Sequence, residues 1–143
     1  MEHTGLSLWK TTLIAGAGSI LANLIVLYFT KSLAPEFTSL SVMPVIFWTV
    51  IATLGAATVF ALTRKCTKNP NRMFIRISLI ALLLSFGMDI PLFFVDIPFF
   101  AGATPGGLWS LMGMHVVAAT IIVSMLVRLT KATASTTSSI PNI

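Results

Sequence analysis

The chain has 143 residues, which is about one domain's worth of sequence. Hydrophobic residues make up 56% of it and charged residues 9%, against about 25% charged in a typical soluble chain. So few charges cannot cover a water-exposed surface. This excludes an ordinary cytosolic enzyme, a disordered tail and a nucleic-acid-binding module, and it predicts a membrane protein.

Four apolar stretches are long enough for membrane-spanning helices, which need roughly 20 residues each. They run over about residues 11–30, 42–63, 74–95 and 108–127. Their connections are short, so neighbouring helices are expected to be antiparallel. We therefore predict an all-α, four-helix transmembrane bundle over residues 1–131, followed by a disordered cytoplasmic tail over residues 132–143. The first stretch exceeds the usual signal-peptide core of about 7–15 residues, so an uncleaved anchor is expected.

Basic residues indicate the orientation of the bundle. If both termini share a side with the connection between the second and third spans, eight of the nine Lys and Arg fall on that side. The positive-inside rule then places both termini in the cytoplasm and the protein in the cell membrane. We also expect the basic connection to attract anionic lipid headgroups, and nucleic acid is not an expected partner. The eight are Lys10, Arg64, Lys65, Lys68, Arg72, Arg76, Arg128 and Lys131, and Lys31 lies on the other side.

The two outer connections differ in composition. Residues 31–43 read as an ordinary polar loop. Residues 91–107 are too apolar for a solvated loop and too rich in Pro and Gly for a continuous helix. We expect this second connection to lie at the membrane interface, where its aromatic residues dip toward lipid or cover the bundle. These are Phe93, Phe94, Phe99 and Phe100.

Three polar residues inside the spans are the informative ones, because a charged Asp near the bilayer centre costs at least roughly 2.5–3.5 kcal/mol. Asp89 lies in the third span, His115 in the fourth and Asn23 in the first. At about 1.5 Å of rise per residue, all three fall at similar depths in the outer half of the membrane. We expect Asp89 and His115 to meet, with Ser85 on the same helix face as Asp89 and with Asn23 joining if the first helix is adjacent.

Such a cluster has three alternative roles: a structural polar lock, proton or ion handling, and ligand binding. Pro91 frees a backbone carbonyl near Asp89 and is expected to kink the helix. No catalytic, metal or cofactor constellation is complete, since His115 is the one His within a span and a metal needs about three or four ligands. The single cysteine, Cys66, excludes an intramolecular disulfide and a CxxC motif.

Several short motifs resemble a family of small four-helix prokaryotic membrane proteins known only as a domain of unknown function. The resemblance covers about residues 8–131. One departure is Met88, where the family pattern leads us to expect a Pro before the Asp. The resemblance implies four helices and importance for Asp89 and His115, and it implies no activity. The motifs are Asn23-Leu24, Gly55-Ala56-Ala57 with Arg64, Leu82-Leu83-Leu84-Ser85 with Asp89, and Met114-His115-Val116-Val117-Ala118-Ala119 with Arg128.

The leading functional hypothesis is a multi-pass membrane protein without a catalytic site, free-standing or an accessory subunit of a membrane complex. One alternative is a small proton-coupled transporter or channel that uses Asp89 and His115. Another is a membrane enzyme that binds lipid or a quinone. No cofactor is expected. The expected partners are membrane lipids, and a homo-oligomer or larger complex is an open alternative.

Overall fold

The computed structural model describes residues 6–33, 35–37, 40–95, 98–100 and 102–130. The predicted tail, residues 132–143, and Lys131 lie outside the described residues. The described part holds four α-helices: α1 (Leu8–Leu33), α2 (Val42–Cys66), α3 (Pro70–Asp89) and α4 (Pro105–Leu129). All four are long and apolar enough to cross a membrane, which confirms the all-α, four-span prediction.

The third helix differs from its predicted bounds of 74–95. It begins earlier, at Pro70, because proline is well suited to the first turn of a helix, where no N–H is needed. Its α-helical part ends earlier, at Asp89, and continues as the 3₁₀ turn η1 (Ile90–Phe93). Pro91 is the reason, because it has no N–H to donate and its ring crowds the carbonyl of the preceding turn. A second 3₁₀ turn, η2 (Pro98–Phe100), follows in the connection to α4.

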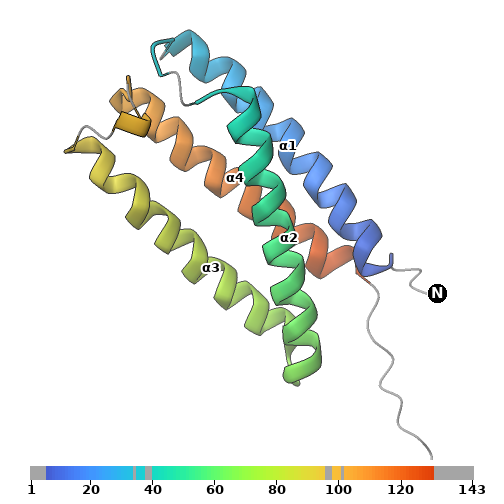
Figure 1. Ribbon diagram of the computed structural model, residues 1–143. Helices are drawn as coiled ribbons and strands as arrows, with labels where there is room; N and C mark the ends of the chain where they lie inside the picture. Colours follow the sequence, from blue (N-terminus) through green and yellow to red (C-terminus); the bar gives the residue numbers. More distant parts are fainter. Residues whose placement is uncertain (1–5, 34, 38–39, 96–97, 101, 131–143) are drawn as a thin grey trace, which may run out of the picture.

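Helix α1 packs along both α4 and α2, whereas α3 packs against α2 and α4. Figure 1 shows α3 set apart from α1, with α2 and α4 between them. Small residues permit the close approach of α1: Ala15 and Ser19 are fully buried, and a side chain at Gly16 would touch Thr53 of α2. This agrees with the usual driving forces in lipid, where close packing and polar contacts replace the hydrophobic effect between helices.

Two apolar clusters lie at opposite ends of the bundle. One fills the end where α1 connects to α2 and α3 connects to α4, and the other lies toward the α2–α3 connection. The third helix and its 3₁₀ extension contribute one residue to each cluster, Leu92 to the first and Phe74 to the second. The first consists of Leu27, Phe37, Leu40, Val45, Leu92, Leu108 and Met114, and the second of Phe60, Phe74, Ala118, Ile122 and Leu126.

The connection between α1 and α2 is not the ordinary polar loop that its composition predicts. Phe37 and Leu40 are 1% and 4% exposed, because both insert into the first apolar cluster. The ammonium of Lys31 donates a hydrogen bond to the Phe37 carbonyl oxygen over 2.9 Å. The Phe37 ring also lies 6.5 Å from that of Phe100, so the α1–α2 connection and the connection between α3 and α4 pack on each other.

The aromatic residues of the second connection divide between the two expected positions. Phe93 and Phe100 pack against the first apolar cluster, whereas Phe94 is exposed. The side chain of Phe99 lies outside the described part of the structure. The connection therefore both covers the bundle and presents an aromatic ring outward.

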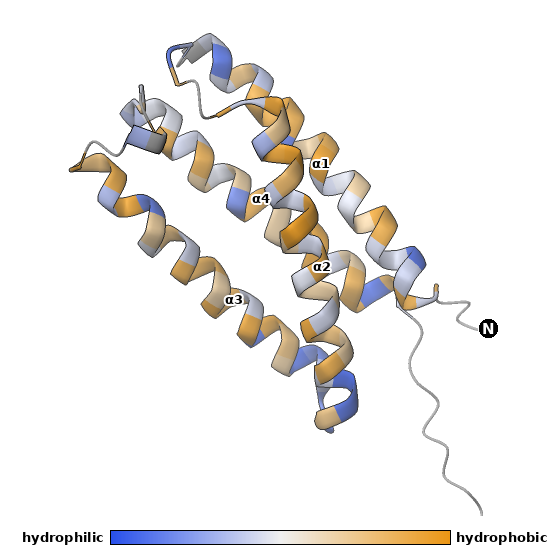
Figure 2. Ribbon diagram, viewed as in Figure 1, coloured by the Kyte–Doolittle hydropathy of each residue, from blue (hydrophilic) through white to orange (hydrophobic). Residues whose placement is uncertain are grey.

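One end of the bundle collects the basic residues and is called here the basic end. It comprises the start of α1, the α2–α3 connection and the end of α4, which Figure 1 shows together. The backbone N–H of Leu6 donates to the Leu129 carbonyl oxygen over 2.7 Å, which joins the first and last of these segments. Figure 2 shows hydrophilic residues at the α2–α3 connection and hydrophobic ones along most of each helix.

Candidate functional site

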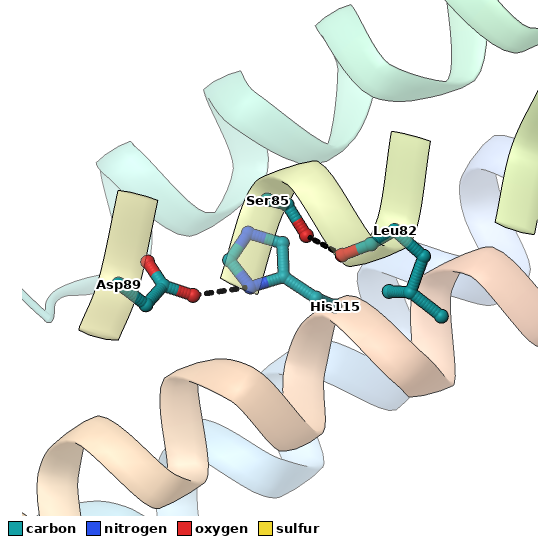
Figure 3. A network of polar contacts seen from close by, with 4 residues as sticks. All are labelled: Leu82, Ser85, Asp89 and His115. Carbon is teal, nitrogen blue, oxygen red and sulfur yellow. Dashed lines mark hydrogen bonds and ion pairs between the residues drawn. The ribbon is translucent and has the colours of Figure 1, made fainter. Parts of the chain in front are cut away.

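Asp89 and His115 come together at the contact between α3 and α4. Asp89 is the last residue of α3, and His115 lies in the third turn of α4. The Nδ1 atom of His115 lies 3.2 Å from Oδ2 of Asp89, and Figure 3 shows the imidazole turned toward the carboxylate. The start of α4, which sets the height of His115, is fixed by Thr104, whose hydroxyl accepts a hydrogen bond from the Gly107 N–H over 3.2 Å.

This contact is largely shielded from the surroundings on the Asp89 side. The Asp89 side chain is 9% exposed and that of His115 is 37% exposed. The two facing atoms are both buried, and neither forms an aligned hydrogen bond with a described residue. Each atom therefore depends on the other for compensation of its charge or polarity. The arrangement can hold an ion pair when the imidazole is protonated, or it can share a proton.

Ser85 lies one turn before Asp89 on α3, and Figure 3 draws its hydroxyl bonded to Leu82. Its hydroxyl donates a hydrogen bond to the Leu82 carbonyl oxygen over 2.7 Å. The hydroxyl therefore bonds within its own helix, as the hydroxyls of serine and threonine commonly do. Within the described residues, Ser85 forms no hydrogen bond to Asp89 or His115.

Asn23 belongs to a different contact from the one expected for it. Its Nδ2 donates a hydrogen bond to Oγ1 of Thr49 on α2 over 3.1 Å, and both residues are buried. The physical reason is the arrangement of the helices, because α1 packs on α2 and α4 while α3 lies on their other side. The sequence pattern alone did not indicate a polar role for Thr49. The signal available in the sequence was that Thr49 lies at a depth similar to that of Asn23, on the helix that follows in the chain.

The five basic residues of the predicted headgroup-attracting group all lie at the α2–α3 connection. Arg64 and Lys65 occupy the last turn of α2, and the Arg64 guanidinium lies 5.8 Å from the centre of the Phe60 ring. Lys68 lies in the connection, and Arg72 and Arg76 follow in the first turns of α3.

The Asp89–His115 pair offers two potential metal ligands. Within the described residues, no group of three or more His, Cys, Asp or Glu side chains comes close enough to hold a metal ion. With their own side chains, Asp89 and His115 can form an ion pair or share a proton.

Four membrane-length helices with a paired Asp and His between two of them define a multi-pass helical membrane protein. The chain belongs to the family of unknown function DUF6069, whose sequence profile matches residues 4–132. This confirms the resemblance to a family of unknown function over nearly the whole chain. No curated protein and no solved structure matches it.

Proposed function

We propose that this protein is a non-catalytic multi-pass protein of the cell membrane, free-standing or an accessory subunit, in which the Asp89–His115 pair locks α3 onto α4. In this proposal consecutive helices are antiparallel and both termini are cytoplasmic. The gathering of Lys10, Arg64, Lys65, Arg72 and other basic residues at the basic end supports that orientation through the positive-inside rule.

The observation that carries the lock is the sparse attachment of α3. Along α3 and η1, only Phe74, Asp89 and Leu92 are buried. Phe74 holds the start of the helix against Phe60, with ring centres 4.8 Å apart. At the other end, Asp89 and Leu92 make the buried contacts. Because lipid supplies no hydrophobic force between helices, the polar pair is a specific attachment there, beside the edge-to-face contact of the Phe93 and Trp109 rings.

A double-mutant cycle tests the lock directly. We expect Asp89→Ala and His115→Ala each to lower the free energy of unfolding by about 1–2 kcal/mol, the range for polar contacts between membrane helices. The double variant should lose less than the sum, with a coupling of about 0.6–1.7 kcal/mol. Equilibrium unfolding in mixed micelles, followed by tryptophan fluorescence, measures these values.

Ser85→Ala is the matched control, because its hydroxyl bonds within α3 and its loss should change stability by less than about 0.5 kcal/mol. Strict additivity of the Asp89 and His115 substitutions would contradict the lock.

Proton handling is a second candidate, favoured by one observation. Nδ1 of the imidazole lies 3.2 Å from Oδ2 of the carboxylate, a separation over which an acid and a base can exchange a proton. A relay predicts proton flux into liposomes under a pH gradient that Asp89→Asn abolishes while the fold survives. The lock predicts equal flux for the wild type and Asp89→Asn. A flux that depends on Asp89 would replace the first proposal with the second.

A further inference from the structure

We infer that an anionic phospholipid binds lengthwise on α3, with its phosphate in a basic pocket at the start of the helix and an acyl chain on an exposed apolar stripe above it. This site lies at the opposite end of α3 from Asp89. The inference requires the membrane-spanning fold and is independent of the Asp89–His115 lock.

The pocket lies at the α2–α3 connection and has a volume of about 320 Å³. Three of its lining side chains carry positive charge, and the amide of Asn69 adds a further donor. The Thr67 hydroxyl donates its proton to the Thr63 carbonyl oxygen over 3.0 Å. Phosphate oxygens are strong acceptors for such charged donors, and arginine binds them in a bidentate manner. The lining residues are Thr67, Lys68, Asn69, Arg72, Met73 and Arg76.

Nothing in the described part of the chain neutralises this charge. The acids that the structure describes, Glu36 and Asp89, lie at the end opposite the basic end, and the first turn of α3 has no acid. No described residue forms an ion pair with Lys68, Arg72 or Arg76. Asn69, the N-cap residue of α3, makes no side-chain capping bond. The partial positive charge of the helix N-terminus therefore adds to that of the three side chains.

An apolar stripe continues from the pocket along the same face of α3. Ile80, Leu83 and Gly87 follow Arg76 at intervals of four, three and four residues, which places them in one line along a helix. Ile80 and Leu83 are 58% and 60% exposed, and a side chain added at Gly87 would meet nothing within 4 Å. Figure 2 shows the change from hydrophilic to hydrophobic residues along α3.

The dimensions of this stripe fit one leaflet of a bilayer. From Arg76 to Gly87 the helix rises about 16 Å, and half of a hydrocarbon core is about 15 Å thick. This helix is also the least covered of the four. Of its most apolar 18-residue stretch, 11% is buried inside the protein, against 22–33% for the corresponding stretches of the other three helices. A charged pocket in line with an open apolar stripe matches a lipid with an anionic headgroup better than a free anion.

The test titrates the purified full-length protein with dioleoyl phosphatidylglycerol and with zwitterionic dioleoyl phosphatidylcholine, using native mass spectrometry. We expect tighter binding of phosphatidylglycerol by the wild type. The triple variant Lys68→Gln/Arg72→Gln/Arg76→Gln should bind it on the order of 100-fold more weakly, at roughly fivefold per cation. If that variant fails to fold, Arg72→Gln and Arg76→Gln alone should each show a loss of about fivefold.

The double variant Arg72→Gln/Arg76→Gln should bind phosphatidylglycerol about 25-fold more weakly, at roughly fivefold per cation. Its matched control is Lys10→Gln/Arg128→Gln, which removes the same charge from the basic end but outside the pocket lining. It should retain phosphatidylglycerol affinity within about threefold, because charges outside the pocket contribute through screened, longer-range attraction. An equal loss in the two double variants would overturn the inference, because it would show general attraction to the basic end.

A competition arm separates a lipid from a free anion. Inorganic phosphate and glycerol phosphate carry the headgroup charge without acyl chains, so neither should displace phosphatidylglycerol at equal concentration. Displacement by either one would show an anion pocket without a lipid stripe and would overturn the inference.

Discussion

Four polar side chains make contacts between helices within the membrane-spanning part of the molecule: Asp89 with His115, and Asn23 with Thr49. The first pair joins α3 to α4, and the second joins α1 to α2. In each pair, two polar groups contact each other instead of lipid hydrocarbon, where each would be costly. Each pair therefore favours one particular contact between helix faces. The pairs differ in chemistry, because only Asp89–His115 can carry charge.

The Asn23–Thr49 bond yields a prediction at the residue scale. Asn23→Ala and Thr49→Val should each lower the free energy of unfolding by about 0.6–1.7 kcal/mol, because each removes a buried interhelical hydrogen bond. The double variant should lose less than the sum of the two. Unfolding in mixed micelles measures this.

Thr58→Val serves as the control, because this exposed hydroxyl bonds to the Leu54 carbonyl of its own helix. A loss of stability in Thr58→Val equal to that in Thr49→Val would show that the interhelical bond is not the cause.

At the scale of elements, the α1–α2 connection and the connection between α3 and α4 act together as one cap on the bundle. Gly102 has φ of 78°, a conformation that glycine adopts without steric cost. A Cβ at this position would also collide with the backbone carbonyl of Glu36 in the other connection. The connections therefore approach each other closely at a position that only glycine fits.

We predict that Gly102→Ala lowers the free energy of unfolding by at least about 1–3 kcal/mol, since it combines an unfavourable φ with a backbone collision. Thermal unfolding in detergent checks this. Gly106→Ala, at an open position in the first turn of α4, is the control and should be close to neutral. A stable Gly102→Ala variant would mean that the two connections separate without cost.

For the whole molecule, the proposed orientation depends on the basic end facing the cytoplasm. Cys66 is an exposed free cysteine at the α2–α3 connection, so it reports the side on which that connection lies. A membrane-impermeant maleimide should label it in inside-out vesicles and leave it unlabelled in right-side-out vesicles. Labelling in right-side-out vesicles alone would reverse the orientation.

The control for this experiment is a variant with Cys66→Ser and Glu36→Cys. Glu36 is exposed in the α1–α2 connection, at the other end of the bundle. Its thiol should show the opposite pattern of labelling, which verifies that the vesicles are sealed and correctly oriented.

The sequence by itself determined the four spans and placed Asp89 and His115 at similar depths, whereas the structure shows their contact. Hydropathy is a local property of the chain, and the cost of an acid in lipid demands a partner at a similar depth. Pro91 also indicated a disturbance after Asp89, which the structure shows as the change from α-helix to 3₁₀ turn.

The tertiary structure alone decided the partner of Asn23 and the packing of the α1–α2 connection. Whether Asn23 meets Asp89 or Thr49 depends on which helices are adjacent, and span lengths do not encode that order. Phe37 and Leu40 read as part of a polar loop because their neighbours in sequence are polar. Their burial follows from the apolar cluster that distant segments place beneath them. The depth of a residue in the membrane follows from its position along a span, whereas the adjacency of helices follows from how they pack.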